Sequence, residues 1–253
     1  MKTKTREYWK IVKEVINQVD LVLEVCDARM PILTRNKEIE NIIKRSGKKL
    51  IIVFNKADLV DEKFINNFKN EKNVVFVSCR KRFGFSKLRR LINLHKGEKK
   101  EIKIGIVGYP NTGKSSIINS LVGRRKALTS PVAGFTKGVQ WITDKKGLLF
   151  YDTPGVIPVD ERDEIRQAII CAVSPQNIKN VDVVAEKIIE MFLPKKDVIE
   201  KAYGIEIEDE SPERIIEMIG EKLKYLKRGG DVDIHRTCVK IINDWQKGRL
   251  RFL

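Results

Sequence analysis

Cysteine and histidine are scarce in this sequence, with four cysteines and two histidines among 253 residues. The cysteines are scattered and form no C-x-x-C pair; they are Cys26, Cys79, Cys171 and Cys238. This spacing argues against a zinc site and against a disulfide framework. Unpaired thiols are typical of proteins in a reducing compartment, so we expect a cytoplasmic protein.

Long hydrophobic runs are also lacking. No apolar stretch approaches the roughly 20 residues that cross a bilayer, and the lysine-rich N-terminus has no apolar core of the kind that a signal peptide needs. We therefore expect neither a membrane span nor a membrane partner. At 253 residues the chain can form one large domain or two modest ones with a substantial core.

Acidic residues are too few to balance the basic ones, since 34 Asp and Glu stand against 50 Lys and Arg, for a net charge of +16. A surplus of this size favours an anionic partner, most simply nucleic acid, through counterion release. Adaptation to heat is the alternative explanation for a chain rich in charged residues. It would enrich both signs, however, and does not require a positive surplus, so we favour nucleic acid.

Residues 108–115 read GYPNTGKS and match the phosphate-binding pattern G-x-x-x-x-G-K-[ST]. Residues 102–107 before them suit a buried strand, and residues 116–122 after them suit a helix closed by Gly123. In this pattern Lys114 reaches the β- and γ-phosphates and Ser115 reaches the Mg²⁺ between them, at a helix N-terminus that favours anions. The alternative is a chance glycine-rich turn. It is disfavoured because the strand, the loop, the Lys-Ser pair and the helix follow one another in the order that the phosphate-binding motif requires.

Residues 55–58 read NKAD and match N-K-x-D, the guanine-reading element of GTPases, directly after the apolar run of residues 50–54. The Asp58 carboxylate can accept hydrogen bonds from the N1–H and the 2-amino group of guanine, whereas adenine offers neither donor. Lys56 can lie along the base, and Asn55 can tie this loop to the phosphate loop. A capped helix start is the alternative, disfavoured by the buried strand before it and the phosphate loop in the same chain.

Three weaker motifs fit the same chemistry. Ser78-Cys79-Arg80 stands where GTPases usually carry S-A-[KL], whose backbone amide supports the guanine oxygen. Thr136, within GFTKG at residues 134–138, suits a switch threonine that completes the Mg²⁺ shell when the γ-phosphate is present. Expected strands at residues 139–143 and 148–151, joined by a hairpin, lead into DTPG at residues 152–155. In this D-x-x-G element Asp152 would hold Mg²⁺ through water and the Gly155 amide would sense the γ-phosphate.

The order of the motifs is unusual, because the guanine motif precedes the phosphate loop. A doubly wound domain has its termini close together, so joining them and cutting elsewhere preserves the fold. We therefore predict an α/β fold: a doubly wound, circularly permuted P-loop GTPase domain at residues 1–160, followed by a smaller all-α C-terminal domain at residues 161–253.

The C-terminal part predicts helices at residues 164–173, 180–192, 195–203, 212–227 and 234–246. Ser211-Pro212 predicts a helix start and Gly229-Gly230 a stop. One apolar stripe favours a core face and consists of Ile215, Ile216, Ile219, Leu223 and Leu226. Tail residues that could face RNA phosphates, or form a solvated surface, are Lys222, Lys224, Lys227, Arg228, Arg236, Lys240, Lys247, Arg249 and Arg251. A second basic cluster consists of Arg80, Lys81, Arg82, Lys87, Arg89 and Arg90.

In these motifs and their order the chain resembles the circularly permuted GTPases of the YlqF type, the family of ribosome biogenesis GTPase A. The resemblance rests on DARMP at residues 27–31, NKAD, GYPNTGKS, GFTK and DTPG, and on IGEK, GG and GRL at residues 219–222, 229–230 and 248–250. It implies hydrolysis of GTP to GDP coupled to maturation of the large ribosomal subunit, with the tail contacting rRNA. No DNA partner is expected.

The chain departs from that family in one respect. Bacterial members often carry a histidine near the N-terminus, proposed to assist catalysis, whereas here Tyr8-Trp9-Lys10 occupies the region and no histidine precedes His95. That mechanism is therefore not transferred. Val156 follows the D-x-x-G element where many GTPases have a water-orienting glutamine, so we expect slow intrinsic turnover that the ribosome stimulates. Asn111 occupies a position that in related GTPases helps to hold K⁺, so K⁺ is a further expected activator.

The predicted nucleotide-binding residues are Asn55, Lys56, Asp58, Ser78, Cys79, Asn111, Thr112, Gly113, Lys114, Ser115 and Ser116. The predicted catalytic residues are Lys114, Thr136 and Gly155, and the predicted Mg²⁺ ligands are Ser115, Thr136 and Asp152. Two rival functions stay open: a GTPase in another RNA pathway such as tRNA modification, which the permuted order disfavours, and a GTP-gated RNA-binding module whose hydrolysis only resets it.

Overall fold

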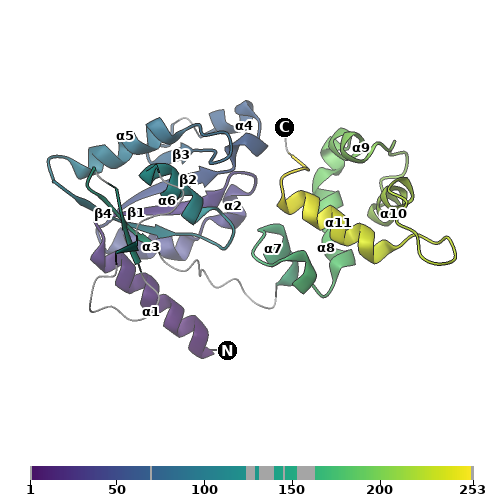
Figure 1. Cartoon of the computed structure of the whole chain (residues 1–253), viewed down its shortest axis with the longest axis horizontal. Coiled ribbons are helices and arrows are strands. Elements are labelled where there is room, and N and C mark those ends of the chain that lie inside the picture. Colours follow the sequence, from purple (N-terminus) through teal and green to yellow (C-terminus); the bar gives the residue numbers. More distant parts are fainter. Residues whose placement is uncertain are drawn as a thin grey trace. The chain divides into compact units, whose positions relative to one another are not determined.

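The computed structural model describes residues 2–68, 70–123, 129–130, 140–144, 146–152 and 163–251. The chain divides into two compact units, Met1–Pro158 and Val159–Leu253, which are described separately (Figure 1). Within the described ranges, every helix is too short or too polar to cross a membrane.

The first unit is built on a seven-stranded sheet of order β3-β2-β1-β4-β7-β6-β5. The strands are β1 (Leu21–Asp27), β2 (Lys49–Asn55), β3 (Val74–Phe76), β4 (Ile102–Val107), β5 (Thr129–Ser130), β6 (Gln140–Thr143) and β7 (Leu148–Asp152). The five strands from β3 to β7 in this order run parallel, and β6 and β5 are added antiparallel. All seven residues of β1 are buried, which explains why this strand reads as an almost continuous apolar run.

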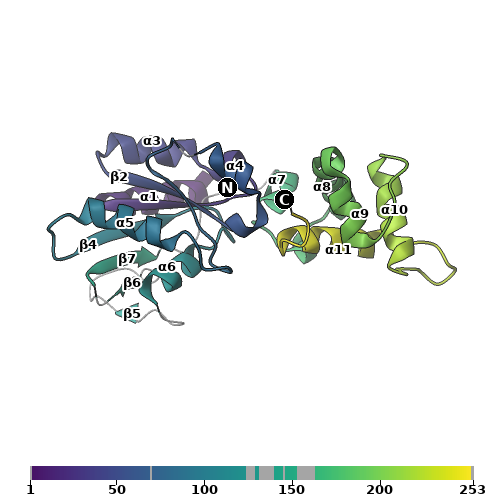
Figure 2. The ribbon, with the colours of Figure 1, turned by 90° about the horizontal axis from the view of Figure 1, so that it is seen from above.

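Helices cover both faces of this sheet (Figure 2). On one face, α5 (Phe85–Lys96) and α6 (Lys114–Val122) contribute Leu88, Ile92 and Ile117 to the larger core cluster. On the other face lie α1 (Lys2–Gln18), α3 (Lys37–Arg45) and α4 (Glu62–Asn66), with the short α2 (Pro31–Thr34) after β1. The close packing of α1 depends on Gly105, since a Cβ there would lie 3.1 Å from the Val15 side chain. The predicted doubly wound α/β fold is confirmed.

The strand order reverses between β1 and β4, because β1 continues to β2 and β3 on one side and β4 to β7 on the other. The two strands are parallel neighbours, with Glu24 paired to Val107 near their carboxyl ends. In open α/β sheets, ligands bind outside the carboxyl ends of the strands at such a switch point. The loops that follow β1, β2 and β4 therefore form the edge where a ligand site is expected.

The described part of the second unit is helical, with α7 (Glu164–Ile169), α8 (Val181–Phe192), α9 (Asp197–Tyr203), α10 (Pro212–Lys222) and α11 (Ile234–Gln246). Phe192 of α8 and Trp245 of α11 pack edge to face with ring centroids 5.8 Å apart, and the Trp245 indole Nε1 donates to the Ile169 carbonyl at 2.8 Å. Asp244 is buried beside them and accepts from the Tyr203 hydroxyl at 3.2 Å and from Arg249 at 2.9 Å. These contacts fasten α7 and α9 to the central helix pair.

Two tail helices end earlier than expected. The helix predicted at residues 212–227 stops at Lys222, because Lys224 takes a left-handed φ of 55° and the Tyr225 amide donates back to the Gly220 carbonyl at 2.9 Å. Leu226 is therefore not part of the core stripe; it is 48% exposed and forms an antiparallel bridge with Val232. Likewise the helix predicted at residues 164–173 ends at Ile169, close to Cys171 with a φ of 60°.

Candidate functional site

The loop after β4 folds around the side chain of Lys114. The Lys114 ammonium donates to the carbonyl oxygens of Gly108 at 2.9 Å and Tyr109 at 2.6 Å, and the residue is only 7% exposed. The Thr112 hydroxyl donates to the same Tyr109 carbonyl at 2.9 Å. These bonds close the loop over the first turn of α6. A buried cation and a helix N-terminus are thereby brought together, an arrangement that attracts anions.

Two glycines let this loop pack directly against the neighbouring strand ends. Gly108 has a φ of 147°, and a Cβ built on it would lie 2.3 Å from the Val25 carbonyl oxygen of β1. Gly113 has a φ of 99°, and its Cβ would lie 2.2 Å from the Asn55 side-chain nitrogen at the end of β2. Any side chain at either position would push the loop away from the sheet.

Asn55 makes the link between two loops that the sequence predicts. Its Nδ2 donates to the Thr112 carbonyl of the phosphate loop at 2.9 Å, and its Oδ1 accepts from the Cys79 backbone amide at 3.4 Å. The side chain is buried, so these bonds form away from competing water. Asn55 therefore joins the loops after β2, β3 and β4 into one structure.

Asp58 is oriented by a neighbouring hydroxyl. The Ser78 Oγ donates to the Asp58 Oδ1 at 2.6 Å and accepts from the Lys81 backbone amide at 2.9 Å. The short distance is typical of a hydroxyl bonded to a carboxylate. Next to it, burial raises the pKa of the Cys79 thiol, which keeps that side chain neutral. The arrangement fixes the direction in which Asp58 presents its carboxylate.

A buried ion cluster after β1 was missed as a functional feature by the sequence analysis. Arg29 donates to both Asp27 carboxylate oxygens, at 3.0 and 2.7 Å, and the Lys56 ammonium pairs with the same carboxylate at 2.7 Å. The Arg29 and Asp27 side chains are 0% and 1% exposed. Burial by itself would raise the pKa of Asp27, but Arg29 and Lys56 hold it well below its usual range. The available signal was the charged pair Asp27 and Arg29 at the end of an almost continuous apolar run.

Glu24 is a second buried carboxyl that the sequence analysis missed. It lies within β1, fully buried, and its Oε1 accepts from the Asn36 backbone amide at 2.7 Å while its Oε2 has no hydrogen-bond partner among the described residues. Asn36 caps α3 and also contacts the Tyr109 hydroxyl of the phosphate loop at 3.4 Å. Burial raises the pKa of Glu24 to about 8, so the carboxyl is mostly protonated at neutral pH.

For the remaining predicted site residues the structure gives only the backbone position or the exposure, or does not describe them. Ser115 and Ser116 lie exposed in the first turn of α6, and Asn111 takes a left-handed φ of 58° in the loop before it. Asp152 ends β7 opposite Ile106 of β4, which puts its backbone at the same edge of the sheet. The Asp152 side chain, Thr136 and Gly155 lie outside the described residues. Within the described ranges, no group of three or more His, Cys, Asp or Glu side chains could hold a metal ion.

Comparisons with known proteins agree with this geometry. Residues 103–218 match the family model described as 50S ribosome-binding GTPase. The chain is 44% identical to an uncharacterized GTP-binding protein of Methanocaldococcus jannaschii, over 96% of this chain and 66% of that protein. It is 31% identical to nucleolar GTP-binding protein 2 of Saccharomyces cerevisiae, over 98% of this chain and 53% of that protein. The chain thus spans about half to two thirds of the length of these two relatives.

Two solved structures resemble the whole chain. GNP-bound YlqF from T. maritima superposes with a TM-score of 0.64 at 26% sequence identity, covering 97% of this chain and 96% of that one. A GDP-bound YlqF superposes with a TM-score of 0.67 at 26% identity, covering 95% of both chains. The likeness therefore includes the helical second unit as well as the sheet.

Proposed function

The chain belongs to the circularly permuted GTPases of the YlqF type, and on this basis we propose that it hydrolyses GTP as an assembly factor of the large ribosomal subunit. The observation that carries the proposal is the junction of three loops at the switch point of the sheet. There the Asn55 side chain donates to the Thr112 carbonyl of the phosphate loop, and the Ser78 hydroxyl donates to the Asp58 carboxylate. A phosphate cradle and a guanine reader are thus held at a fixed separation.

Base recognition follows from the chemistry of Asp58. With Oδ1 held by Ser78, the carboxylate accepts from the N1–H and 2-amino groups of guanine. Adenine would place an acceptor against it and leave a charged group unpaired, so ATP is rejected. Lys56, held by Asp27 through its ammonium, lays its hydrocarbon stem beside the base.

Hydrolysis is the in-line attack of water on the γ-phosphorus, which releases GDP and phosphate. Lys114 exchanges its bonds to loop carbonyls for bonds to phosphate oxygens and stabilises the negative charge that moves onto them. Mg²⁺ bound with the nucleotide would supply further charge neutralisation; Ser115 would hold it with its hydroxyl and Asp152, proposed from the sequence alone, through water. Thr136 and Gly155 are proposed, from the sequence alone, to complete the Mg²⁺ shell and to contact the γ-phosphate.

Turnover of the isolated protein is expected to be slow, on the order of 10⁻³ s⁻¹ or below, because Val156 cannot orient water. K⁺ near Asn111 and the ribosome are the proposed sources of acceleration. The second unit is proposed to bind rRNA through its C-terminal stretch, because residues 222–253 contain nine lysines and arginines and only three acidic residues. The four cysteines are free, which supports the proposal of a reducing compartment such as the cytoplasm.

The assignment is tested by nucleotide affinities of the wild type and of Asp58→Asn, measured by calorimetry. The wild type should bind GDP at least roughly 100-fold more tightly than ADP. The variant should lose affinity for GDP and gain it for xanthosine diphosphate, because xanthine has a carbonyl where guanine has its amino group. Equal wild-type affinity for GDP and ADP would contradict the assignment. Turnover of GTP with and without large subunits then separates a ribosome-stimulated GTPase from a GTP-gated RNA-binding module.

A further inference from the structure

The segment around α5 carries positive charge with no negative charge to balance it. Residues 77–97 contain seven lysines and arginines and no aspartate or glutamate. Five of the seven are exposed and project from α5 and from the turn that leads into it; these five, Arg80, Lys81, Arg82, Lys87 and Arg90, are here named the α5 surface. None of the five forms an ion pair with a carboxylate in the described part of the chain.

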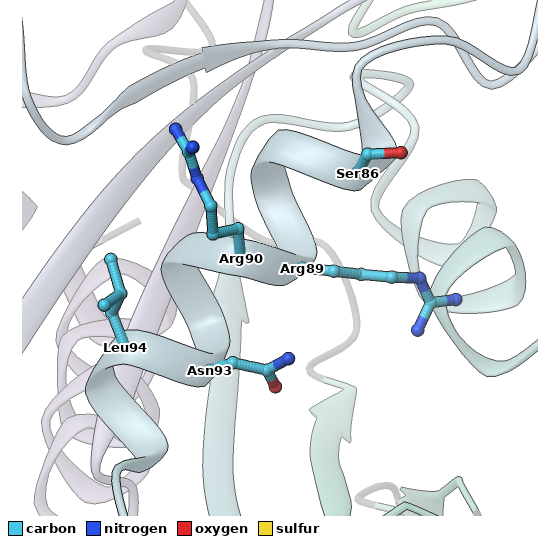
Figure 3. A pocket seen from close by; sticks show the side chains of 5 residues that line it. All are labelled: Ser86, Arg89, Arg90, Asn93 and Leu94. Atoms are coloured by element: carbon cyan, nitrogen blue, oxygen red, sulfur yellow. The ribbon is translucent and has the colours of Figure 1, made fainter.

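The other two basic residues, Arg89 and Lys96, donate hydrogen bonds to backbone carbonyls of the same unit. Arg89 donates to the carbonyl oxygens of Ser120 and Leu121, at 3.2 and 2.5 Å, at the C-terminal end of α6. Lys96 donates to the Lys146 carbonyl at 2.7 Å. Figure 3 shows Arg89 directed toward a neighbouring helix, with Arg90 on another side of α5. Arg89, predicted from sequence as part of the basic cluster, therefore does not belong to the α5 surface.

The turn that carries three of the five charges is fixed to the sheet. The Ser78 amide donates to the Phe83 carbonyl at 3.1 Å, and the Lys81 amide donates to the Ser78 hydroxyl at 2.9 Å. Gly84 passes so close to β3 that a Cβ on it would lie 2.1 Å from the Phe76 carbonyl oxygen. The backbone beneath these charges is thus ordered before any partner arrives, which lowers the entropy lost on binding.

Groups suited to nucleotides lie among the charges. Phe83 is 41% exposed and Leu94 is 69% exposed, so a ring and an aliphatic side chain are available to an unstacked base or a ribose. Ser86 and Asn93 line a shallow hollow beside Arg90 and offer neutral donors and acceptors for phosphate and 2′-hydroxyl oxygens (Figure 3). Charge alone would also suit an anionic membrane, but the exposed polar side chains favour RNA.

We propose that the α5 surface binds the phosphate backbone of RNA, as a contact separate from that of the helical second unit. This proposal rests on the proposed function for the source of the RNA, the large ribosomal subunit. Lys81 of this surface donates its backbone amide to the Ser78 hydroxyl, which also orients Asp58, so the bound RNA lies next to the loop that carries Asp58.

The test removes three charges of the α5 surface in the full chain, in the variant Arg80→Gln/Lys87→Gln/Arg90→Gln. Binding to deproteinised large-subunit rRNA is measured between 50 and 300 mM KCl. Each lost phosphate contact lowers the slope of log Kd against log salt by about 0.7 to 0.9, so the slope should fall by about 2 to 3. Affinity near 150 mM salt should fall at least about 10-fold.

A matched control removes the same charge from the opposite face of the sheet, with Lys37→Gln/Lys44→Gln/Arg45→Gln on α3. The control should keep the wild-type slope, and both variants should keep the wild-type affinity for GDP, which shows that the site is folded. Equal losses in the two variants, or an unchanged slope in the α5 variant, would overturn the proposal.

Further outcomes separate this inference from the proposed function. If the wild type binds large subunits and the α5 variant binds their rRNA equally well, only the α5 proposal fails. If the wild type binds neither rRNA nor large subunits, the proposed function fails with it. Binding of the wild type to phosphatidylserine vesicles but not to rRNA, lost in the α5 variant, would assign the surface to a membrane and overturn the RNA proposal.

Discussion

Replacing Glu24 with glutamine should remove a large pH dependence of stability from the first unit. Burial raises the pKa of Glu24 from 4.5 to about 8, so the folded state favours the protonated carboxyl. The stability that this group contributes is therefore complete below pH 4.5 and is lost as the pH rises toward 8. A pKa shift of one unit corresponds to about 1.4 kcal/mol of unfolding free energy. The shift of Glu24 therefore lowers the unfolding free energy by about 5 kcal/mol in total, of which about 3 kcal/mol is lost between pH 5.5 and 8.

Glutamine reproduces the shape of the protonated carboxyl and cannot ionise. It can still accept from the Asn36 amide, as Glu24 Oε1 does. The difference in unfolding free energy between Glu24→Gln and wild type should therefore shift by about 3 kcal/mol in favour of the variant between pH 5.5 and 8.

The assay measures urea unfolding, with hydrogen exchange of the β1 backbone amides as the readout. Because β1 lies in the first unit, this readout reports the stability of that unit alone. Glu98→Gln, at an exposed position, is the control and should show no such shift. A difference between Glu24→Gln and wild type that is the same at both pH values would refute the reasoning, because it would mean that Glu24 is ionised throughout.

Three further predictions concern the nucleotide site. Gly113→Ala places a Cβ against Asn55 and should weaken GDP binding more than 10-fold by calorimetry, whereas Gly123→Ala, with a φ of 77° and open space around it, should cost stability but little affinity. Ser78→Ala removes a hydrogen bond to the guanine-reading carboxylate, worth about 1.5 to 3 kcal/mol, so GDP affinity should fall about 10- to 100-fold; an unchanged Kd would show that the bond is irrelevant. GTP turnover should be faster in K⁺ than in Na⁺ at equal ionic strength, and Asn111→Gly, which suits the positive φ, should erase that difference.

The parts of the fold that could be predicted are those that depend on residues close together in the chain. Apolar runs predicted buried strands of the parallel sheet. The bounds of α11 agree with the prediction because the Asp233 side chain caps the helix start. The phosphate loop and the guanine motif could be predicted because their chemistry depends on residues adjacent in the chain, and their site roles stay predictions.

The parts that were missed depend on residues distant in sequence. The pairing of Asp27 with Lys56 exists only because β1 and β2 are parallel neighbours whose ends coincide. Glu24 is a single polar residue in an apolar stretch, and its burial and its bond to the Asn36 amide before α3 appear only in the folded structure. The early end of α10 depends on Lys224 adopting a left-handed conformation. Glycine usually signals that conformation, and a lysine at this position gives no such signal.

The central claim is that the chain is a guanine-nucleotide switch acting on the large ribosomal subunit, and co-sedimentation with that subunit tests it most directly. Binding is measured with a non-hydrolysable GTP analogue, with GDP and with the matching ATP analogue. The account predicts that the GTP analogue strengthens binding about 5- to 150-fold over GDP, the range of a useful coupling, and that the ATP analogue has no effect. Equal binding in the GTP-analogue and GDP states, or binding that an ATP analogue supports as well, would contradict it.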